Sequence, residues 1–228
     1  ERVINLLHEV IAAKGYEQDT YFEMAIRDIG MLPKLEGTEH VNMALIIKFI
    51  RKYFFDPVDY PVVTRSTDIS DDHYLFNQKT GGLASIPFPD YRRAYASVSA
   101  GNAVIFREQV ELFRSLLVHA PPSTEQQNNI DYMLGAGELF TLIVYAQLIL
   151  ENSEIYTLDA DLLEQIFSFL VKDFSAQALQ MNLHFENSEK QQEYFTLMLK
   201  KPILDEKLDE RVWKQRVSVL KDRYSMNE

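Results

Sequence analysis

The chain has 228 residues, a formal net charge of −11 and no cysteine. Its 46% of hydrophobic residues supply a core for one large helical domain or two smaller ones, which argues against a disordered chain. The acidic charge argues against nucleic acid or an anionic membrane as the main partner, and the lack of cysteine excludes disulfides and thiolate metal sites.

Three helices are predicted in the first quarter of the chain, where apolar residues recur every three or four positions. The first covers residues 1–13. The second is capped by Asp19 or Thr20 and runs towards Pro33, and the third covers residues 38–55.

Residues 56–89 break this helical pattern. Four of the eight prolines and the Gly81-Gly82 pair lie here, together with several scattered aromatic residues. These apolar groups are too many for a free tether, so we expect an ordered strap across the surface. The strap is also the expected boundary between two helical parts.

Long helices are predicted after this segment. They are expected at residues 90–119, 123–152, 159–185, 188–201 and 209–220. Ser123 and Gln126 have the spacing of a capping box, while Asp159 and Asp209 are placed to cap the helices that follow them.

The fold class predicted from this pattern is all-α, because no β-alternation of useful length is present. The simplest arrangement is an antiparallel helical bundle. We expect three parts, covering residues 1–55, 56–89 and 90–228.

The most apolar run of the chain, residues 139–150, is predicted to be a buried core helix. A membrane-spanning helix needs roughly 20 apolar residues, and this run is shorter. We therefore expect no transmembrane segment and a cytoplasmic protein.

The turn between the second and third helices combines a carboxylate, Glu36, with Gly37 and Thr38. Gly37 lets another molecule approach the backbone closely, because glycine has no Cβ. Thr38 is placed to accept hydrogen bonds from the first N–H groups of the next helix. The residues alone allow two interpretations, namely part of an active site or a carboxylate that caps or solvates a helix boundary.

Three short motifs in this opening third occur in a characteristic order and at characteristic separations. They are Glu9-Val-Ile-Ala12-Ala13-Lys-Gly15-Tyr16, Arg27-Asp28 and Glu36-Gly37-Thr38. In these motifs the chain resembles the C-terminal helical domain of the acyl-CoA dehydrogenase family. The later helices look like the helical extension that follows this domain in the longer-chain members.

The resemblance implies an FAD-dependent oxidoreductase of fatty acid metabolism, which removes hydrogens from the α and β carbons of an acyl-CoA thioester. Glu36 corresponds to the glutamate that removes the α-proton in most family members. Gly37 would lie against the CoA thioester. Desolvation by an apolar acyl chain would raise the pKa of such a carboxylate and make it a better base.

The resemblance also implies cofactor contacts. Thr38 and His40 would touch FAD. Glu9, Ala12 and Ala13 would face its adenosine side, in the family often across a dimer interface. Considered by themselves, the residues favour a plainer interpretation, with His40 as a partly exposed helix residue and Glu9, Ala12 and Ala13 as ordinary helix residues.

Several parts of the family's fold have no counterpart in these residues, among them the N-terminal helical domain, the β-domain and the first helices of the C-terminal bundle. The family also has Gln and a Gly-Gly pair where this chain has Glu9 and Ala12-Ala13. We therefore expect the isolated chain to be inactive, and expect a homo-oligomer or contact with a missing N-terminal part. The apolar face of the first helices should be buried by a second copy, another chain or the helices after residue 90.

The competing hypothesis is a non-catalytic helical module for oligomerisation or partner docking, which keeps a degenerate remnant of the site. Arg27 and Asp28 are expected to form a pair that fixes the loop before Glu36. Residues 71–73, Asp-Asp-His, are interpreted as solvated more readily than as metal ligands, and no metal site is predicted. Glu138 is expected at the rim of the core rather than as a buried acid.

Overall fold

The computed structural model describes residues 2–18, 20–35, 37–59, 76, 81–82, 85–99, 101–184 and 186–221. Its α-helices are α1 (Arg2–Ile11), α2 (Tyr21–Leu35), α3 (Glu39–Ile46), α4 (Ile50–Phe55), α6 (Arg92–Ala96), α7 (Gly101–His119), α8 (Thr124–Asn128), α9 (Ile130–Tyr156), α10 (Ala160–Asn182), α11 (Glu189–Leu197) and α12 (Leu208–Val212). Shorter helical turns are η1 (Ala12–Tyr16), η2 (Ile47–Phe49), η4 (Trp213–Val217) and η5 (Ser218–Leu220). The described residues contain no strand, which confirms the all-α class.

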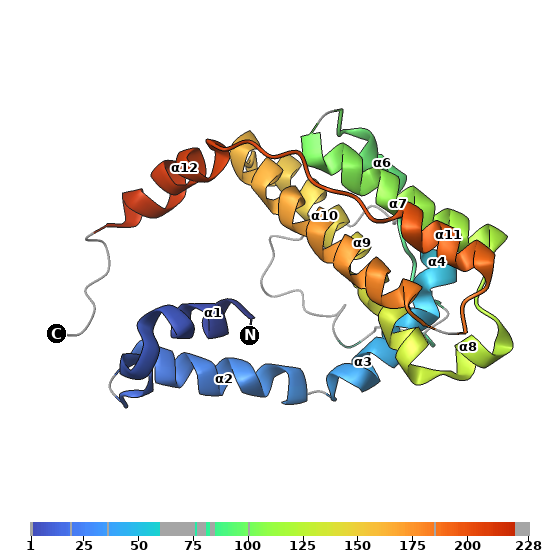
Figure 1. Ribbon diagram of the computed structural model, residues 1–228, viewed down its shortest axis with the longest axis horizontal. Coiled ribbons are helices and arrows are strands. Elements are labelled where there is room, and N and C mark those ends of the chain that lie inside the picture. The colour runs from blue at the N-terminus through green and yellow to red at the C-terminus, as the bar shows by residue number, and fades with distance from the viewer. Residues whose placement is uncertain are drawn as a thin grey trace.

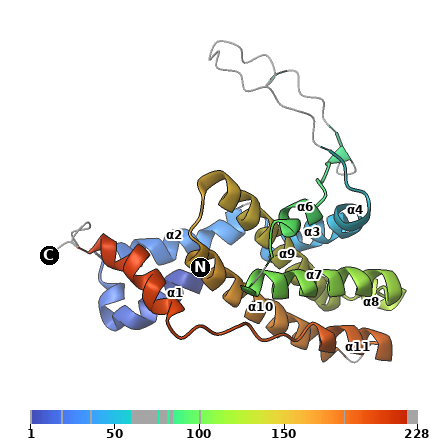
Figure 2. The same cartoon turned by 90° about the horizontal axis from the view of Figure 1, so that it is seen from above.

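Helices α9 and α10 form the centre of the molecule and are joined by a tight turn at Thr157 (Figure 1). Helix α9 contacts α3, α6, α8 and α10, and α10 contacts α7, α11 and α12 as well. Seen from above, α7, α9, α10 and α11 lie side by side (Figure 2). The observed arrangement is a bundle of long helices with one shared core.

Aromatic rings fill the middle of this core. Phe106 on α7 is fully buried, and its ring lies 5.7 Å from Phe167 and 5.5 Å from Phe174 on α10, measured between centroids. On the other side, Tyr53 of α4 lies 5.1 Å from Phe140 of α9. Each buried aromatic side chain removes about 150–250 Å² from water, so these rings account for much of the burial in the bundle.

Helix α9 is also the most apolar helix of the structure. By length and composition it could cross a membrane, with a mean hydropathy of 1.7 over its most apolar window. Half of that window is buried inside the bundle, and a single helix of this kind is weak evidence for a membrane span. The described residues include no second helix of this kind.

Two of the predicted long helices are each divided into a short and a long helix. Gly101 begins α7 with a φ of +73°, a left-handed conformation that glycine adopts easily. The N–H group of the next residue, Asn102, donates to the carboxylate of Glu164, at 2.9 and 3.0 Å from its two oxygens. Asn129 separates α8 from α9 because its side-chain oxygen accepts from the first N–H groups of α9. Single helices over 90–119 and 123–152 were therefore wrong predictions.

The capping box at Ser123 and Gln126 is confirmed, and a second one occurs at Ser188 and Gln191. The two glutamines also bind each other, with each amide nitrogen donating to the other's oxygen at 3.0 and 2.9 Å. Both glutamines are buried. This pair therefore joins the start of α8 to the start of α11, although the two lie far apart in the sequence.

Of the two predicted aspartate caps, Asp159 is confirmed and Asp209 is wrong. Asp159 accepts from the N–H groups of residues 161 and 162 at the start of α10. Asp209 lies inside the first turn of α12, because this helix begins one residue earlier, and its carboxylate accepts from Gln165 at 2.7 Å.

An ion-pair cluster attaches α12 to the start of α10. Arg211 donates to both oxygens of Asp161 at 2.7 Å, and to Asp205 at 2.7 Å. Its hydrogen bonds lower the pKa of both carboxyl groups below their usual range. The segment beyond α12, with Trp213, projects away from the bundle (Figure 1).

The first two helices form a hairpin that also projects from the bundle (Figure 1). Helix α2 continues to Leu35, past Pro33, where the sequence predicted its end. Few residues of the hairpin are buried, and these are His8, Gly15 and Ala25. A Cβ at Gly15 would lie 2.6 Å from the His8 ring, so the turn closes only around a glycine.

The two ends of the predicted strap lie together beside the bundle. The N–H of Val58 donates to the carbonyl of Phe88 at 2.8 Å. The Phe88 ring lies 5.4 Å from Phe49, between centroids. The strap between them, with residues 71–73, falls largely outside the described residues.

Candidate functional site

The turn between α2 and α3 has the backbone geometry that the sequence suggested. Gly37 has a φ of +106°, which favours glycine. Thr38 has an extended conformation and is the N-cap of α3, and its hydroxyl accepts from the N–H of Val41 at 3.4 Å. His40 is exposed on the first turn of α3. Glu36, the predicted catalytic base, lies outside the described residues.

Helix α3, which follows this turn, is packed against α9 of the bundle. Met43 on α3 is buried over Gly137 of α9, where an added Cβ would lie 2.3 Å from its sulfur. The hydroxyl of Thr141 lies 3.9 Å from the same sulfur. Helix α3 is therefore fixed to α9, and its first turn marks where the hairpin leaves the bundle.

The residues assigned to the adenosine side of a flavin lie at the other end of the hairpin. Glu9, Ala12 and Ala13 are exposed where α1 passes into η1. Helix α2 separates them from Thr38, and its 15 residues span about 22 Å. Figure 1 shows η1 and α3 at opposite ends of α2. The described residues of one chain thus do not form a complete flavin site.

Ala12 has an unusual conformation, with a φ of +56°. This is the left-handed region, where a Cβ crowds the following carbonyl oxygen. A glycine is favoured at such a position. The backbone of the turn therefore matches the Gly-Gly pair of the acyl-CoA dehydrogenase family better than the alanine that this chain has.

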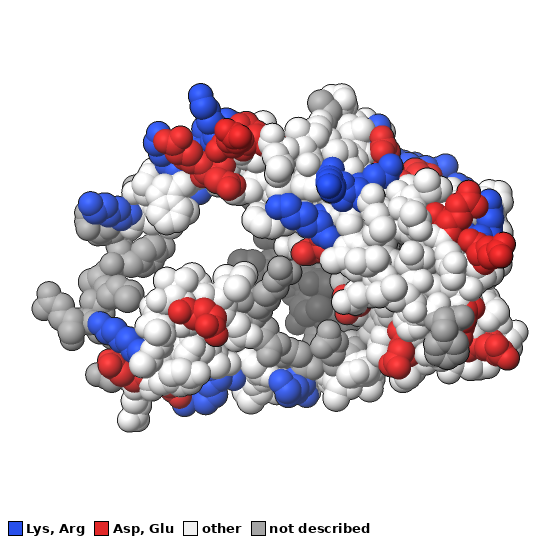
Figure 3. Space-filling view, in the orientation of Figure 1, with Lys and Arg blue, Asp and Glu red and all other residues white. Residues whose placement is uncertain are grey.

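The surface of the hairpin is rich in exposed apolar side chains. Val10 on α1 is 83% exposed and Leu32 on α2 is 65% exposed. The other large ones on these two helices are Val3, Leu6, Leu7, Tyr21, Met24, Met31 and Leu35. Figure 3 shows a mostly uncharged surface here and an opening between the hairpin and the segment around α12. Burial of this face was expected against a second copy, another chain or the helices after residue 90. The helices after residue 90 do not cover it, so that third alternative is wrong.

Arg27 and Asp28 do not fix the loop before Glu36. Both lie in the middle of α2 with exposed side chains, and their charged atoms are 4.0 Å apart. Arg27 binds Glu23, one turn earlier, at 3.0 Å. Exposed pairs of this kind contribute less than about 1 kcal/mol to stability.

Buried tyrosines in the bundle are structural. Burial raises the pKa of Tyr53 and of Tyr95 above the ordinary tyrosine value. Their protonated hydroxyls donate to the side chain of Gln147 and to the carbonyl of Ile143, respectively. They therefore act as hydrogen-bond donors that join α4 and α6 to α9.

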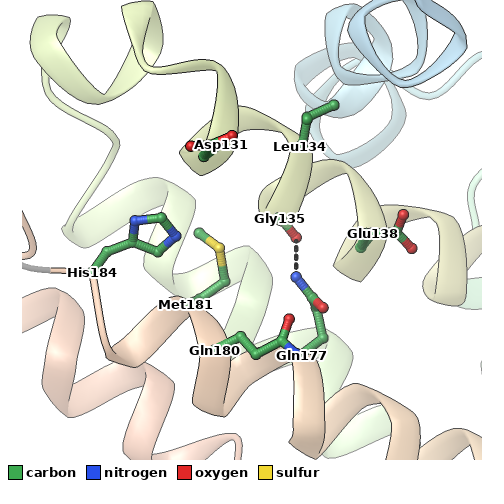
Figure 4. Close-up of a pocket in the computed structure, with 8 residues that line it drawn as sticks. All are labelled: Asp131, Leu134, Gly135, Glu138, Gln177, Gln180, Met181 and His184. Atoms are coloured by element: carbon green, nitrogen blue, oxygen red, sulfur yellow. Dashed lines mark hydrogen bonds between the residues drawn. The ribbon is translucent and has the colours of Figure 1, made fainter. Parts of the chain in front are cut away.

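A pocket of about 350 Å³ opens between α9 and α10, and the sequence did not predict it (Figure 4). Its walls come from the start of α9 and the end of α10. The lining residues are Asp131, Leu134, Gly135, Glu138, Gln177, Gln180, Met181 and His184. Each set of four follows an i, i+3, i+4, i+7 pattern, so helical periodicity could have placed them on two facing stripes. Glu138 also lines this pocket and is half-buried, which fits the expected position at the rim of the core rather than a buried acid.

Metal ligands do not cluster in the described part of the chain. No group of three or more His, Asp or Glu side chains there is arranged to hold a metal ion. His184 instead contacts the Tyr132 ring edge-on, with 5.6 Å between centroids.

The chain was compared with protein-family models, curated proteins and solved structures. None of the three comparisons found a match. The resemblance to the acyl-CoA dehydrogenase family therefore stays a prediction, which rests on the three motifs and on the turn geometry around Gly37 and Ala12.

Proposed function

We propose that this chain is the C-terminal part of an acyl-CoA dehydrogenase-like flavoprotein. The observation that carries the proposal is the apolar, uncovered face of the α1–α2 hairpin next to the Gly37–Thr38 turn. Helices of this length are marginal by themselves in water, and contiguous apolar faces mark surfaces that another element covers. Further bundle helices, from a second copy or from a preceding segment, would both cover the face and complete the site.

In this proposal Glu36 takes the α-proton of an acyl thioester. The turn suits that role because Gly37 leaves its backbone open to a ligand, while Thr38 fixes the start of α3. An apolar acyl chain would exclude water from the carboxylate and raise its basicity. Thr38 and His40 of one chain, together with residues outside it, would hold FAD, which would supply a hydride acceptor for the β carbon.

The test replaces Glu36 by Gln in the full-length gene product and measures acyl-CoA dehydrogenation. General-base catalysis contributes about 10²–10⁴-fold, so activity should fall by about that factor while flavin content and circular dichroism persist. Glu17→Gln is the matched control, since Glu17 is exposed between η1 and α2. Retained activity in Glu36→Gln would show that Glu36 is not the base.

The second candidate function is a non-catalytic docking module, and the exposed hairpin favours it as well. Flavin absorbance of the purified full-length protein separates the two. A flavin that co-purifies and is bleached by an acyl-CoA thioester supports the dehydrogenase. A colourless protein whose hairpin becomes protected from hydrogen exchange on association supports the docking module.

A further inference from the structure

Residues 211–221 differ in charge from the rest of the protein. They contain four basic residues and no acidic one, whereas the whole chain has 34 acidic and 23 basic residues. We call these eleven residues the basic segment; its cations are Arg211, Lys214, Arg216 and Lys221. The acidic balance that argues against an anionic partner for the protein as a whole therefore does not hold for this segment.

Most of these cations are available to a partner. Arg211 is engaged by the ion-pair cluster that attaches α12 to the bundle. Lys214 lies 2.9 Å from Glu210, but both side chains are more than 60% exposed, and such pairs contribute little to stability. Arg216 and Lys221 are exposed and form no ion pair with the described residues. Three cations thus face solvent beyond the point of attachment.

Apolar side chains of the same segment are exposed as well. Val212 is buried, and every described residue after it is exposed. Trp213 is 61% exposed, and Val217, Val219 and Leu220 are each more than 40% exposed. The backbone stays helical through η4 and η5. The segment therefore presents an aromatic ring, three aliphatic side chains and three cations with nothing packed over them among the described residues.

The position of the segment favours an anionic partner despite the acidic bundle. It projects away from the bundle (Figure 1). Salt screens charges over about 8 Å at physiological ionic strength, so the acidic surface of the bundle acts mainly on the start of the segment, at Arg211. The cations further along are free to meet negative charge on another surface.

An anionic lipid surface matches both properties of the segment. Lys and Arg side chains are attracted to lipid phosphates, while Trp and aliphatic side chains enter the boundary between headgroups and acyl chains. The α1–α2 hairpin of a second copy is apolar too, but its residues 2–35 contain five acidic and four basic residues. That hairpin would cover the apolar side chains and leave the cations without partners.

We propose that the basic segment docks this protein on an anionic membrane surface. Trp213, Val217 and Leu220 enter the headgroup boundary, and Lys214, Arg216 and Lys221 contact lipid phosphates. The contact is peripheral and reversible, since it combines three cations with a few apolar side chains. Arg211 and the buried Val212 hold the segment to the bundle, which is carried to the surface with it. The proposal does not depend on the proposed dehydrogenation.

Tryptophan fluorescence of the full chain tests this docking, because Trp213 is the single tryptophan. Vesicles of phosphatidylserine and phosphatidylcholine in equal parts should shift its emission to shorter wavelength, since an indole in the headgroup boundary leaves water. Vesicles of phosphatidylcholine alone should leave the emission unchanged. Co-sedimentation of the chain with the same vesicles measures the affinity.

Two sets of substitutions separate the charged from the apolar contribution. The double variant Arg216→Gln with Lys221→Gln should bind the anionic vesicles about 25-fold more weakly, because each cation contributes about fivefold. Trp213→Ala should weaken binding about tenfold or more, because it removes the largest apolar side chain of the segment. All three residues are exposed, so circular dichroism should stay unchanged.

The matched control is the double variant Arg51→Gln with Lys190→Gln. Both residues are exposed, on α4 and α11, and Figure 1 places these helices at the opposite end of the molecule from α12. The control makes the same change in net charge and should keep the affinity within about twofold. Equal weakening in both double variants would overturn the proposal, since the vesicles would then respond only to overall charge.

Two further outcomes count against the docking. One is equal binding to both kinds of vesicle, or binding to neither. The other is a shift of the Trp213 emission without lipid as the protein concentration rises, together with a dimer in size-exclusion chromatography. That result would assign the segment to a second copy of the chain and overturn the membrane proposal.

Discussion

The N-terminal hairpin and the bundle contain similar apolar side chains in opposite environments. Leu6 on α1 is 58% exposed, whereas Leu139 on α9 has no exposed surface. The residue type is the same, so the difference lies in the neighbours. Apolar side chains are stabilised by burial, and the hairpin offers them only one neighbouring helix.

The distribution of apolar residues around each helix determines how many neighbouring surfaces are required to bury them. Apolar residues gather on one side of α1, so a single facing surface would bury them. Helix α9 is apolar on all sides and contacts α3, α6, α8 and α10, although Tyr145, Leu148, Ile155 and Tyr156 stay more than half exposed. The comparison teaches that the bundle helices share one buried core, while the apolar face of the hairpin has no partner among the described residues.

The largest expected effect comes from matched leucine-to-alanine substitutions in the two regions. Leu139→Ala should lower the free energy of unfolding by about 2–5 kcal/mol, since it removes buried methyl groups and leaves a cavity. Leu6→Ala should change it by less than about 0.5 kcal/mol, because the side chain is already in water. Urea unfolding followed by circular dichroism measures both.

This pair also sharpens the proposed function. If a second copy or another segment covers α1, as the proposed function requires, Leu6→Ala should become as costly in that assembly as a core substitution. If Leu6→Ala stays neutral in that assembly, the hairpin is not covered and the proposal loses its supporting observation.

A smaller effect is expected inside the hairpin. Gly15→Ala would place a Cβ 2.6 Å from the ring of His8, a buried side chain, and should destabilise the hairpin by about 1–3 kcal/mol. Amide hydrogen exchange should quicken in α1 and α2 and stay unchanged in α9. Quickened exchange in α9 would mean that the two regions unfold together.

Ala12→Gly is the opposite change in the same turn. It relieves a left-handed alanine with a φ of +56° and should stabilise the hairpin by about 1 kcal/mol. Exchange in α1 should therefore slow. Faster exchange in this variant would show that the turn does not hold this conformation in solution.

The smallest effect concerns the attachment of α12 to the bundle. The hydrogen bonds of Arg211 lower the pKa values of Asp161 and Asp205, so their stabilisation is present above the ordinary carboxyl pKa of about 4. It is lost as the pH falls through the lower pKa values of the folded state. Trp213, the single tryptophan, reports this as a decrease in fluorescence anisotropy.

Arg211→Gln provides the control for this acid transition. The variant should have low anisotropy already at neutral pH, because the contact with Asp161 and Asp205 is gone. The bundle should keep its circular dichroism through the change. If anisotropy and circular dichroism fall together, α12 is held by the bundle core and not by the ion pairs.

Capping residues were the most informative local signals. Thr38, Ser123 and Asp159 were all placed correctly as caps, because a side-chain oxygen beside free N–H groups is a local arrangement. Asp209 was a wrong prediction, since α12 begins at Leu208 and its N-cap position is Lys207, which makes no side-chain cap hydrogen bond. Local chemistry predicts that a helix begins near a residue, with an error of a residue or two.

Breaks inside long apolar stretches were not predictable in this way. The separation of α6 from α7 depends on Glu164, which is some 60 residues away and accepts from Asn102. The pocket likewise combines residues of two helices, where Gly135 of α9 lies against Met181 of α10. The turn at Gly37 and Thr38 was predictable because its conformation depends on neighbouring residues. Its separation from Glu9 and Ala12 was not predictable, because it depends on how α1 and α2 are arranged in space.

The sequence by itself determined that this protein is helical, where most helices begin, and which faces are apolar, because these depend on neighbouring residues. The tertiary structure decided which apolar faces are covered and which side chains meet. Those outcomes depend on contacts between helices distant in sequence, whose packing no local pattern specifies. This is why Leu139 and its neighbours on α9 are buried in the bundle while the apolar face of the α1–α2 hairpin is exposed.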